Sequence, residues 1–383
     1  MSRQIDIVLL GGGHAHVQVL VALARRPVPG VQVTLVSRDA KALYSGMLPG
    51  VVAGLYAPEK AQIDLVRLAA ATGARFVHAE AVGIDRSNKR VILAAAPTVG
   101  YDILSIDVGI APALAAIAGV ERALAVKPIG SFLPRFGELI ARCRRPDDPK
   151  RIAVIGGGAG GVELLLSIRT RLMAETQAAL SFALVTDGEI LATHNSRVRA
   201  AFRRIFAERG IALHEHRRAR AVTMRAIELE GGETIAADAV LIATDAAAPD
   251  WFRETGLALD PHGFLAIGPT LQATNDPDVF AAGDCAALIE TPHEKSGVYA
   301  VRAGPPLADN LRRRSLGEPL EAWRPQRRHL VLISTGERYA VASRGMFKME
   351  GAWVWTLKDW IDRRWVRQYR DVAPIERRRP GAK

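Results

Sequence analysis

Residues 151–163 read Arg-Ile-Ala-Val-Ile-Gly-Gly-Gly-Ala-Gly-Gly-Val-Glu, and this stretch decides the fold. A short apolar run at 152–155 leads into a glycine turn at 156–161, and an amphipathic helical pattern follows at 162–174. In such a strand–G-x-G-x-x-G–helix unit the glycines allow a tight turn, close approach to a pyrophosphate and close helix–strand packing. The free N–H groups of the helix then bind phosphate. The stretch therefore predicts a dinucleotide site at Gly156, Gly158 and Gly161.

A second unit of the same kind lies at the N-terminus. The apolar run at 5–10 is followed by Gly11-Gly12-Gly13-His14-Ala15-His16. His16 stands where the third glycine belongs, so the helix and strand lie slightly apart there or the ring points aside. The two histidines are either tolerated at a turn, or His14 lies beside a phosphate and supplies partial positive charge. The candidate phosphate-binding residues are Gly11, Gly13, His14 and Ala15.

The rest of the chain alternates between strand-like and helical patterns. Apolar runs cover 31–36, 75–78, 181–185 and 239–243, and a helical pattern covers 17–26. Strands that alternate with helices of this length predict βαβ units, parallel sheets and an α/β fold. Two glycine turns within this pattern predict two Rossmann-like dinucleotide-binding domains.

Composition narrows the class of protein. The 383 residues are 49% apolar and 24% charged, which excludes a disordered chain. Two distant cysteines, Cys143 and Cys285, exclude a disulfide scaffold and a Cys-x-x-Cys pair. We find no signal-peptide pattern and no uninterrupted apolar run of about 18 residues. We expect a cytoplasmic protein without a metal site or nucleic-acid partner, with attachment to the inner face of the membrane as the alternative.

The acid that binds a ribose lies about 20 residues past the glycine turn in such units. That region is Val36-Ser37-Arg38-Asp39 in the N-terminal unit and Val185-Thr186-Asp187-Gly188-Glu189 in the other. In the second region no arginine precedes Arg197, so its acidic residues favour NADH over NADPH. The candidate nucleotide-binding residues are Ser37, Arg38, Asp39, Thr186 and Asp187.

A further motif follows at 279–284, Val-Phe-Ala-Ala-Gly-Asp. It predicts a short buried strand that ends at Gly283 and Asp284. A carboxylate at a strand end, after a glycine, is well placed to accept hydrogen bonds from the hydroxyls of a ligand. A helix N-cap is the alternative role for Asp284.

The order of these three motifs resembles the two-dinucleotide-binding flavoproteins of the pyridine nucleotide–disulfide oxidoreductase fold. Strands at 101–109 and 237–244 match as well, although Thr244-Asp245 replaces the usual Thr-Gly. The resemblance implies an FAD-binding domain at 1–115 and 246–325, an NAD(P)H-binding domain at 116–245 and a C-terminal segment at 326–383. It places the flavin ribityl chain at Asp284. It also implies flavin contacts from Leu48, Pro49, Val82 and Val298, and a nucleotide contact from Thr244.

Residues 44–50, 295–302 and 355–364 are most similar to type II NADH dehydrogenases, sulfide:quinone reductases and the flavoprotein module fused to selenide, water dikinase. This similarity implies an NADH donor and a quinone-like or other diffusible acceptor. Arg302-Ala303 replaces the Gln pair on the quinone side, which leaves the acceptor open. The alternatives are a flavin reductase that serves selenium or sulfur metabolism and an NADH-responsive binding or sensor protein.

Few side chains are expected to take part in the chemistry, because a bound flavin performs it. Cys143 is expected alone in a charged loop and Cys285 in the core, which favours direct electron transfer from the flavin. Glu163 is the candidate for orienting the nicotinamide, and an acid favoured by the helix dipole is the alternative. Lys127 lies near the flavin or is a solvated surface lysine.

The basic charge is concentrated at the C-terminal end. Residues 312–383 carry 18 Lys and Arg against 8 Asp and Glu, which accounts for +10 of the net charge of +11. A helix at 353–370 would carry a stripe of Trp353, Leu357, Ile361, Trp365 and Tyr369, flanked by Lys358, Arg363, Arg364, Arg367 and Arg370. Such a helix suits an anionic membrane surface or an acidic partner. The alternative is packing of the tryptophans on the flavin domain or in a dimer interface.

Overall fold

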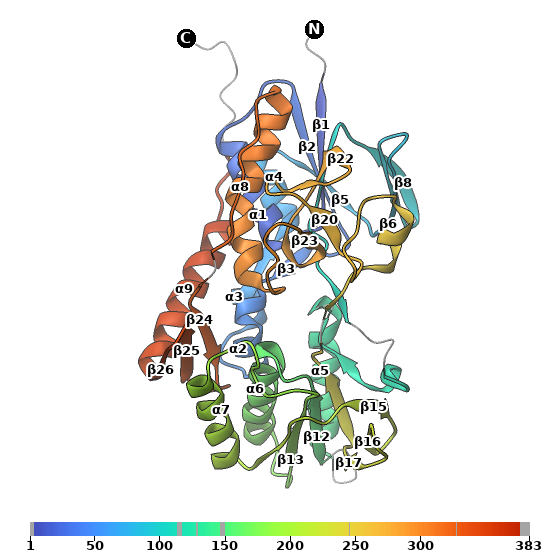
Figure 1. Ribbon diagram of the computed structural model, residues 1–383. Coiled ribbons are helices and arrows are strands. Elements are labelled where there is room, and N and C mark those ends of the chain that lie inside the picture. The colour runs from blue at the N-terminus through green and yellow to red at the C-terminus, as the bar shows by residue number, and fades with distance from the viewer. Residues whose placement is uncertain are drawn as a thin grey trace.

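The computed structural model describes residues 4–112, 117–127, 129–145, 150–244, 246–326 and 328–375. Two α/β units lie one above the other, and the C-terminal segment runs along both of them (Figure 1). The predicted α/β fold with two Rossmann-like units is confirmed.

The upper unit in Figure 1 is built on a sheet of eight described strands in the order β23-β20-β21-β22-β9-β1-β2-β5. Strand β1 pairs in parallel with β2 and β9, and β22 pairs in parallel with β9. Helices cover this sheet, so its central strands are almost continuously apolar. The strands are β1 (Ile5–Leu10), β2 (Val31–Ser37), β5 (Arg75–His78), β9 (Ile103–Ile106), β20 (Leu265–Ile267), β21 (Gln272–Ala273), β22 (Asp276–Ala281) and β23 (Ala286–Leu288). The helices are α1 (His14–Arg25), α4 (Leu65–Thr72) and α8 (Gly297–Leu316).

The lower unit is built on five described parallel strands in the order β11-β18-β12-β13-β14. The strands are β11 (Leu124–Ala125), β12 (Arg151–Ile155), β13 (Ser181–Val185), β14 (Ile211–His214) and β18 (Ala239–Ile242). The helices are α5 (Ile129–Cys143), α6 (Ala159–Glu175) and α7 (Ser196–Glu208).

The two units repeat one topology. The strand order β9-β1-β2-β5 in the upper unit corresponds to β18-β12-β13-β14 in the lower unit. Each unit also has a three-stranded antiparallel sheet just before the last of these strands in the chain. These sheets consist of β6 (Ala81–Asp85), β7 (Arg90–Leu93) and β8 (Ala96–Gly100), and of β15 (Ala219–Val222), β16 (Ala226–Leu229) and β17 (Thr234–Ala236). The glycine turns therefore follow equivalent strands, β1 and β12.

Short elements connect the two units. Helix α2 (Leu48–Val52) packs against α6, and β10 (Ala111–Pro112) pairs with β19 (Ala246–Ala247) where the chain passes from one unit to the other. Helix α3 (Pro58–Ala61) and the pair β3 (Lys41–Leu43) and β4 (Gln62–Asp64) lie at the lower end of the upper unit (Figure 1).

The C-terminal segment joins both units. It consists of β24 (Val331–Ser334), β25 (Ala340–Arg344), β26 (Phe347–Gly351) and the long helix α9 (Ala352–Arg370). Helix α9 begins beside the lower unit and runs upward to contact α3, β4 and α1 (Figure 1). Of the helices in the described ranges, none is both long enough and apolar enough to cross a bilayer.

Helix α8 contains two prolines, Pro305 and Pro306, which cannot donate to the carbonyl groups four residues earlier. The carbonyl oxygen of Val301, freed by Pro305, accepts a 2.6 Å hydrogen bond from Nε2 of Gln18 on α1. Gly304 lets the Gln18 side chain approach, since a Cβ there would lie 2.4 Å from Gln18 Nε2. This contact fixes the N-terminal part of α8 against α1.

Candidate functional site

A single large cleft contains nearly all of the predicted binding residues. Its volume is about 2790 Å³. Pockets for one small ligand are typically about 300–1,000 Å³, so this cleft has room for more than one ligand. It is lined by Gly11, Gly13, His14, Ser37, Arg38, Asp39, Leu48, Pro49, Val82, Asp284 and Val298, and by Gly156, Gly158, Glu163, Thr186, Asp187 and Thr244. Ala15, Gly161 and Gly283 do not line it.

The second glycine turn has the geometry of a dinucleotide site. A Cβ on Gly161 would lie 2.1 Å from the carbonyl oxygen of Gly156, so α6 can approach β12 only with glycine there. A Cβ on Gly158 would meet nothing within 4 Å, and no side chain caps the N-terminus of α6. Among the described residues, none forms a hydrogen bond with the buried hydroxyl of Thr244. The uncapped N-terminus of α6 fits a pyrophosphate. Residue 245, whose identity departs from the family pattern, lies outside the described residues.

At the first glycine turn His16 takes the place of the third glycine. Its ring is fully buried, with Nδ1 2.7 Å from the carbonyl oxygen of Gly11 and Nε2 2.8 Å from Oγ of Ser105. Burial lowers the pKa of His16 to about 4. The neutral ring therefore bridges the helix to the glycine turn and to β9, whereas at the second turn the backbones of the helix and the turn are in direct contact.

His14 begins α1 at the wall of the cleft, without the partial positive charge that one of its two interpretations gave it. Burial, the largest cause, lowers its pKa to about 4, so the ring is neutral near pH 7. Its Nε2 accepts a 3.3 Å hydrogen bond from the Ser45 N–H. The ring packs against both Tyr44 and Trp365, with centroids 5.2 and 5.4 Å away. His14 is thus an uncharged part of an aromatic cluster.

Asp107, which follows β9, is a site residue that the sequence reasoning missed. Its Oδ2 accepts hydrogen bonds from the N–H groups of Ala15 at 3.0 Å and His16 at 3.3 Å. A Cβ on Gly13 or Gly283 would overlap this carboxyl group, at closest distances of 2.1 and 2.3 Å. Burial raises the pKa of Asp107 to about 7. The available signal was a charged residue directly after a buried apolar strand and two residues before Gly109.

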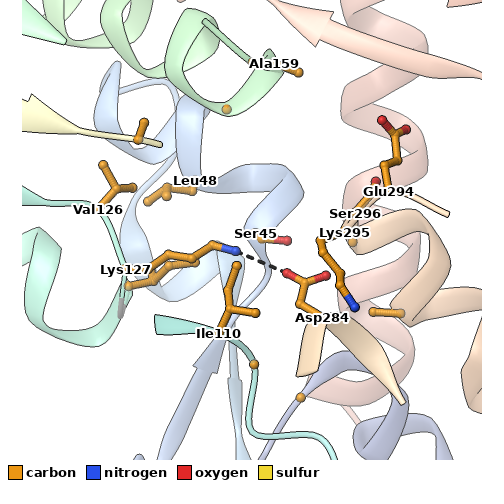
Figure 2. A pocket seen from close by; sticks show the side chains of 18 of the residues that line it. Ser45, Leu48, Ile110, Val126, Lys127, Ala159, Asp284, Glu294, Lys295 and Ser296 are labelled. Atoms are coloured by element: carbon orange, nitrogen blue, oxygen red, sulfur yellow. Dashed lines mark hydrogen bonds and ion pairs between the residues drawn. The ribbon is translucent and has the colours of Figure 1, made fainter. Parts of the chain in front are cut away.

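Asp284 connects the two units across the cleft. It lies at the end of β22, in a short turn at Gly283–Cys285, and Lys127 reaches it from the lower unit with Nζ 3.1 Å from Oδ2 (Figure 2). Lys127 therefore lines the cleft and is ion-paired there, while its side chain stays 38% exposed. On the other side of Asp284, Lys295 lies with Nζ 4.0 Å from the centre of the Phe264 ring (Figure 2).

The backbone at Val298 is partly engaged by the protein. Ser296 caps α8, and its hydroxyl accepts a 3.4 Å hydrogen bond from the Val298 N–H. Leu48 and Pro49 form the first turn of α2 at the cleft wall, and Val82 is 44% exposed at its rim.

Glu163 belongs to a buried charged group that α9 completes. Its Oε1 accepts a 2.6 Å hydrogen bond from the N–H of Ser334. Nearby, Lys358 Nζ donates to the carbonyl oxygen of Gly46 at 2.7 Å and to Oδ2 of Asp362 at 2.8 Å. Burial raises the pKa of Glu163 to about 7, and the positive charge of Lys358 opposes this rise. Glu163 therefore ionises near neutral pH.

The ribose regions differ from the expected arrangement. The Ser37 hydroxyl donates a 2.8 Å hydrogen bond to the carbonyl oxygen of Asp39. Glu189 is neutralised by Arg199 and Arg203, with N–O distances of 3.3 and 2.9 Å. Strands β13 and β14 are parallel neighbours, so the residues that follow them lie side by side at this edge of the cleft. One of them is Arg217, whose backbone N–H donates a 2.8 Å hydrogen bond to the carbonyl oxygen of Thr186. The premise that no arginine balances these acids is therefore wrong for Glu189.

The two cysteines lie in separate cores. Cys285 is fully buried with the β1 sheet, as predicted, and burial raises the pKa of its thiol to about 12. Cys143 is the last residue of α5 and is fully buried with the β12 sheet, so its predicted place in a charged loop is wrong. Within the described ranges, no group of three or more His, Cys, Asp or Glu side chains is placed to hold a metal ion.

The predicted apolar stripe of the C-terminal helix is divided between the interior and the surface. Trp365 stacks on Tyr44 with centroids 4.5 Å apart and packs beside Tyr369 at 4.9 Å. Trp353 and Trp360 are 55% and 58% exposed. Packing of a tryptophan on the upper unit, the alternative, is therefore confirmed for Trp365.

Comparisons with known proteins agree with this architecture. Residues 5–309 match the family model described as pyridine nucleotide-disulphide oxidoreductase. Ferroptosis suppressor protein 1 of Xenopus tropicalis is 22% identical over 344 residues, which cover 85% of each chain. Demethylphylloquinone reductase NdbB of Synechocystis sp. is 24% identical over 289 residues, 73% of this chain and 71% of the relative.

Two solved structures share the fold across almost the whole chain. The sulfide:quinone oxidoreductase of Aquifex aeolicus has a TM-score of 0.79 at 17% identity, covering 97% of this chain and 93% of that one. NDH2 of Plasmodium falciparum in complex with NADH also has a TM-score of 0.79, at 14% identity, covering 98% and 100%. With its two open glycine turns and its match over residues 5–309, this chain is an oxidoreductase that belongs to the pyridine nucleotide-disulphide oxidoreductase family, whose members bind FAD and NAD(P)H.

Proposed function

We propose that this protein is an FAD-dependent NADH dehydrogenase that passes electrons from NADH to a quinone-like acceptor. The observation that carries the proposal is that the cleft has a third wall, in addition to the two walls formed around the glycine turns. The C-terminal segment and the loop before it build this wall, which suits a flat apolar ring. It consists of Leu330, Val331, Leu332, Ile361 and Trp365. The names of the Synechocystis and Aquifex relatives, both quinone-linked, support this choice of acceptor.

The two nucleotides divide between the two units in this proposal. Residues 1–115 and 246–325 form the FAD-binding domain, residues 116–245 form the NAD(P)H-binding domain, and residues 326–383 form the C-terminal segment. FAD, when bound, supplies hydride acceptance and electron release, while the chain positions both partners. The first glycine turn, Leu48, Pro49, Val82, Asp284 and Val298 would hold FAD. The second glycine turn, Glu163, Thr186, Asp187 and Thr244 would hold the nicotinamide nucleotide.

Protons for the acceptor come from the buried group around Glu163 in this proposal. Overall, NADH, one proton and a quinone give NAD⁺ and a quinol. Glu163 titrates near neutral pH, so it can give up a proton inside the cleft and regain it from solvent. Among the residues that the structure describes, the buried N–H of Trp365 in the same wall has no hydrogen-bond partner. The two cysteines lie in separate cores and cannot act as a dithiol, so the proposed electron transfer proceeds without one.

A two-stage kinetic experiment tests the proposal. The flavin of the purified protein is reduced anaerobically with NADH and then reoxidised with a panel of quinones and of selenium and sulfur compounds. We expect fast reduction and fastest reoxidation by quinones. Fastest reoxidation by a selenium or sulfur compound would replace the quinone with that acceptor, and reduction without reoxidation would favour a sensor.

A matched pair of variants locates the acceptor. Ile361→Glu places a charge in the third wall and should raise the KM for the quinone at least tenfold, with the rate of flavin reduction by NADH unchanged. Met224→Glu, at an 83% exposed position outside the cleft, is the control and should change neither. Equal quinone kinetics in both variants would place the acceptor elsewhere.

We also propose peripheral attachment to a membrane, through exposed apolar side chains rather than through the basic face of α9. On that face Lys358 and Arg363 are paired with Asp362 and Asp359. The exposed apolar residues are Met346 and Phe347 at the β25–β26 turn and Trp353 and Trp360 on α9, with exposed fractions of 55–75%. Vesicle sedimentation tests this. Binding to vesicles that persists at high salt, is lost in Phe347→Glu and is kept in Met224→Glu supports attachment through apolar side chains, and no binding to vesicles contradicts it.

A further inference from the structure

The two glycine turns differ in one neighbouring residue. In each unit this residue directly follows the strand that lies beside the turn, which is β9 in the upper unit and β18 in the lower unit. A Cβ on Gly11 would lie 2.3 Å from the carbonyl oxygen of Asp107, and a Cβ on Gly156 would lie 2.3 Å from the carbonyl oxygen of Ala243. Asp107 therefore occupies in the upper unit the place that Ala243 occupies in the lower unit. The upper unit has a buried carboxyl group where the lower unit has a methyl group.

Because of this difference, the carboxyl group of Asp107 lies at the N-terminus of α1. The N–H groups of Ala15 and His16 belong to the first helical turn, whose donors have no partner within the helix. Both donate to Oδ2 of Asp107. Asp107 is only 3% exposed and lies against Gly13, the N-cap of the helix. A phosphate bound at this turn would share the helix N-terminus with a carboxyl group.

We propose that Asp107 takes up a proton from solvent when FAD binds at the first glycine turn, so that FAD binds more tightly as the pH falls from about 8 to about 6. The proposal rests on the proposed function, because it assigns FAD to this turn. It adds a proton to the binding reaction: apoprotein, FAD and one proton give the complex.

The reason is repulsion between like charges in a buried place. A pyrophosphate brings negative charge beside a carboxylate that water does not screen, and a proton on Asp107 removes that repulsion. The protonated group keeps lone pairs on Oδ2, so the hydrogen bonds from α1 can persist. Burial raises the pKa of Asp107 to about 7, and the nearby charge of Asp284 adds to this effect. An added anion raises the pKa further.

The histidine and cysteine side chains that face Asp107 do not change their protonation between about pH 6 and about pH 8. On α1, His14 and His16 have pKa values lowered to about 4 by burial, so both stay neutral. On the turn after β22, the Cys285 thiol has a pKa raised to about 12 and stays protonated. Asp284, on the same turn, contributes negative charge and acts in the same direction as the pyrophosphate. Lys127 is paired with Asp284.

Isothermal titration of FAD into the full-length apoprotein, in two buffers of different ionisation enthalpy, measures proton uptake. We expect uptake approaching one proton at about pH 8 and little at about pH 6. The Kd for FAD should rise with pH by up to about tenfold per pH unit. Asp107→Asn keeps an acceptor for α1 without the charge, so it should abolish the uptake and bind FAD more tightly than the wild type at pH 8.

Glu163→Gln is the matched control, because Glu163 is another buried carboxyl group of the cleft whose pKa is raised to about 7. It should keep the wild-type uptake. Tight FAD binding by the wild type without proton uptake at pH 8 overturns the inference, even if the Asp107 variant does not fold. Uptake that persists in Asp107→Asn overturns it as well. Absence of FAD binding would instead contradict the proposed function.

Discussion

The two glycine turns show how one motif can be supported in two ways. At the second turn, Gly161 lets the backbone of α6 approach Gly156 directly, and no side chain occupies the helix N-terminus. At the first turn, the His16 ring fills the equivalent gap, and Asp107 takes up two of the helix donors. The second turn is held by close backbone packing, whereas the first is held by buried polar side chains. The turns should therefore respond differently to the same substitution.

The largest expected difference is between Gly13→Ala and Gly158→Ala, at the equivalent N-caps of α1 and α6. A methyl group at residue 13 would overlap Asp107, so Gly13→Ala should lose bound FAD and about 1–3 kcal/mol of stability. A methyl group at residue 158 meets only open cleft. Gly158→Ala should keep wild-type stability and FAD while its NADH affinity falls at least tenfold. Thermal unfolding, flavin content and NADH titration measure these effects.

The double variant Gly13→Ala, Asp107→Ala is the control for this explanation. It removes the carboxyl group that the new methyl group would overlap, so part of the lost stability should return. A Gly13→Ala protein as stable as the wild type would show that the first turn is not packed as described.

The next effect concerns the carboxylates of the two units. Asp284→Ala should weaken FAD binding by about 10–100-fold, because a hydrogen bond to a charged group contributes about 1.5–3 kcal/mol. Asp187→Ala, in the lower unit, should leave the Kd for FAD unchanged and alter only the affinity for the nicotinamide nucleotide. Fluorescence titration of the apoproteins measures both. Unchanged FAD affinity in Asp284→Ala would remove Asp284 from the flavin site.

A smaller effect concerns nucleotide choice at the second turn. We expect NADH to reduce the flavin faster than NADPH, since Asp187 repels a 2′-phosphate. Arg217 lines the same edge and pairs with Glu233 at 3.3 Å, so it offsets that repulsion only in part, and Arg217→Ala should increase the preference for NADH by up to about fivefold. Stopped-flow reduction with the two nucleotides checks this. Equal rate constants and affinities in the wild type would contradict the preference for NADH.

The smallest effect is expected at the cysteines, one in each unit. The variant Cys143→Ser, Cys285→Ala should keep NADH oxidation with an artificial acceptor within about twofold. Burial keeps the Cys285 thiol protonated, and direct electron transfer needs neither sulfur. A hundredfold loss of turnover with FAD still bound would contradict direct transfer.

Several features of the fold were predictable because they depend on local sequence. Strands β1, β5 and β13 have the predicted bounds, since short apolar runs bounded by turn residues determine a buried strand. Each glycine turn was recognisable because the three backbone requirements of the motif lie within six residues. The same locality explains why α9 was predicted within one residue of its observed start.

The contacts within the cleft depend on residues far apart in the chain. The pairing of Lys127 with Asp284 joins residues 157 positions apart, and the Gly46–Lys358 contact spans 312. The charge of His14 also could not be predicted from its place at a helix N-terminus, because burial beneath Trp365 of α9 neutralises it.

The sequence by itself therefore determined the two dinucleotide units and their order, because strand periodicity and the geometry of a glycine turn are local properties. Only the tertiary structure decided which side chains face those turns. Asp107, Lys127, Glu163 and Arg217 obtain their partners from elements brought together by sheet order and by the long C-terminal helix. Burial and electrostatics act through space, so the protonation and pairing of these groups follow from packing rather than from position in the chain.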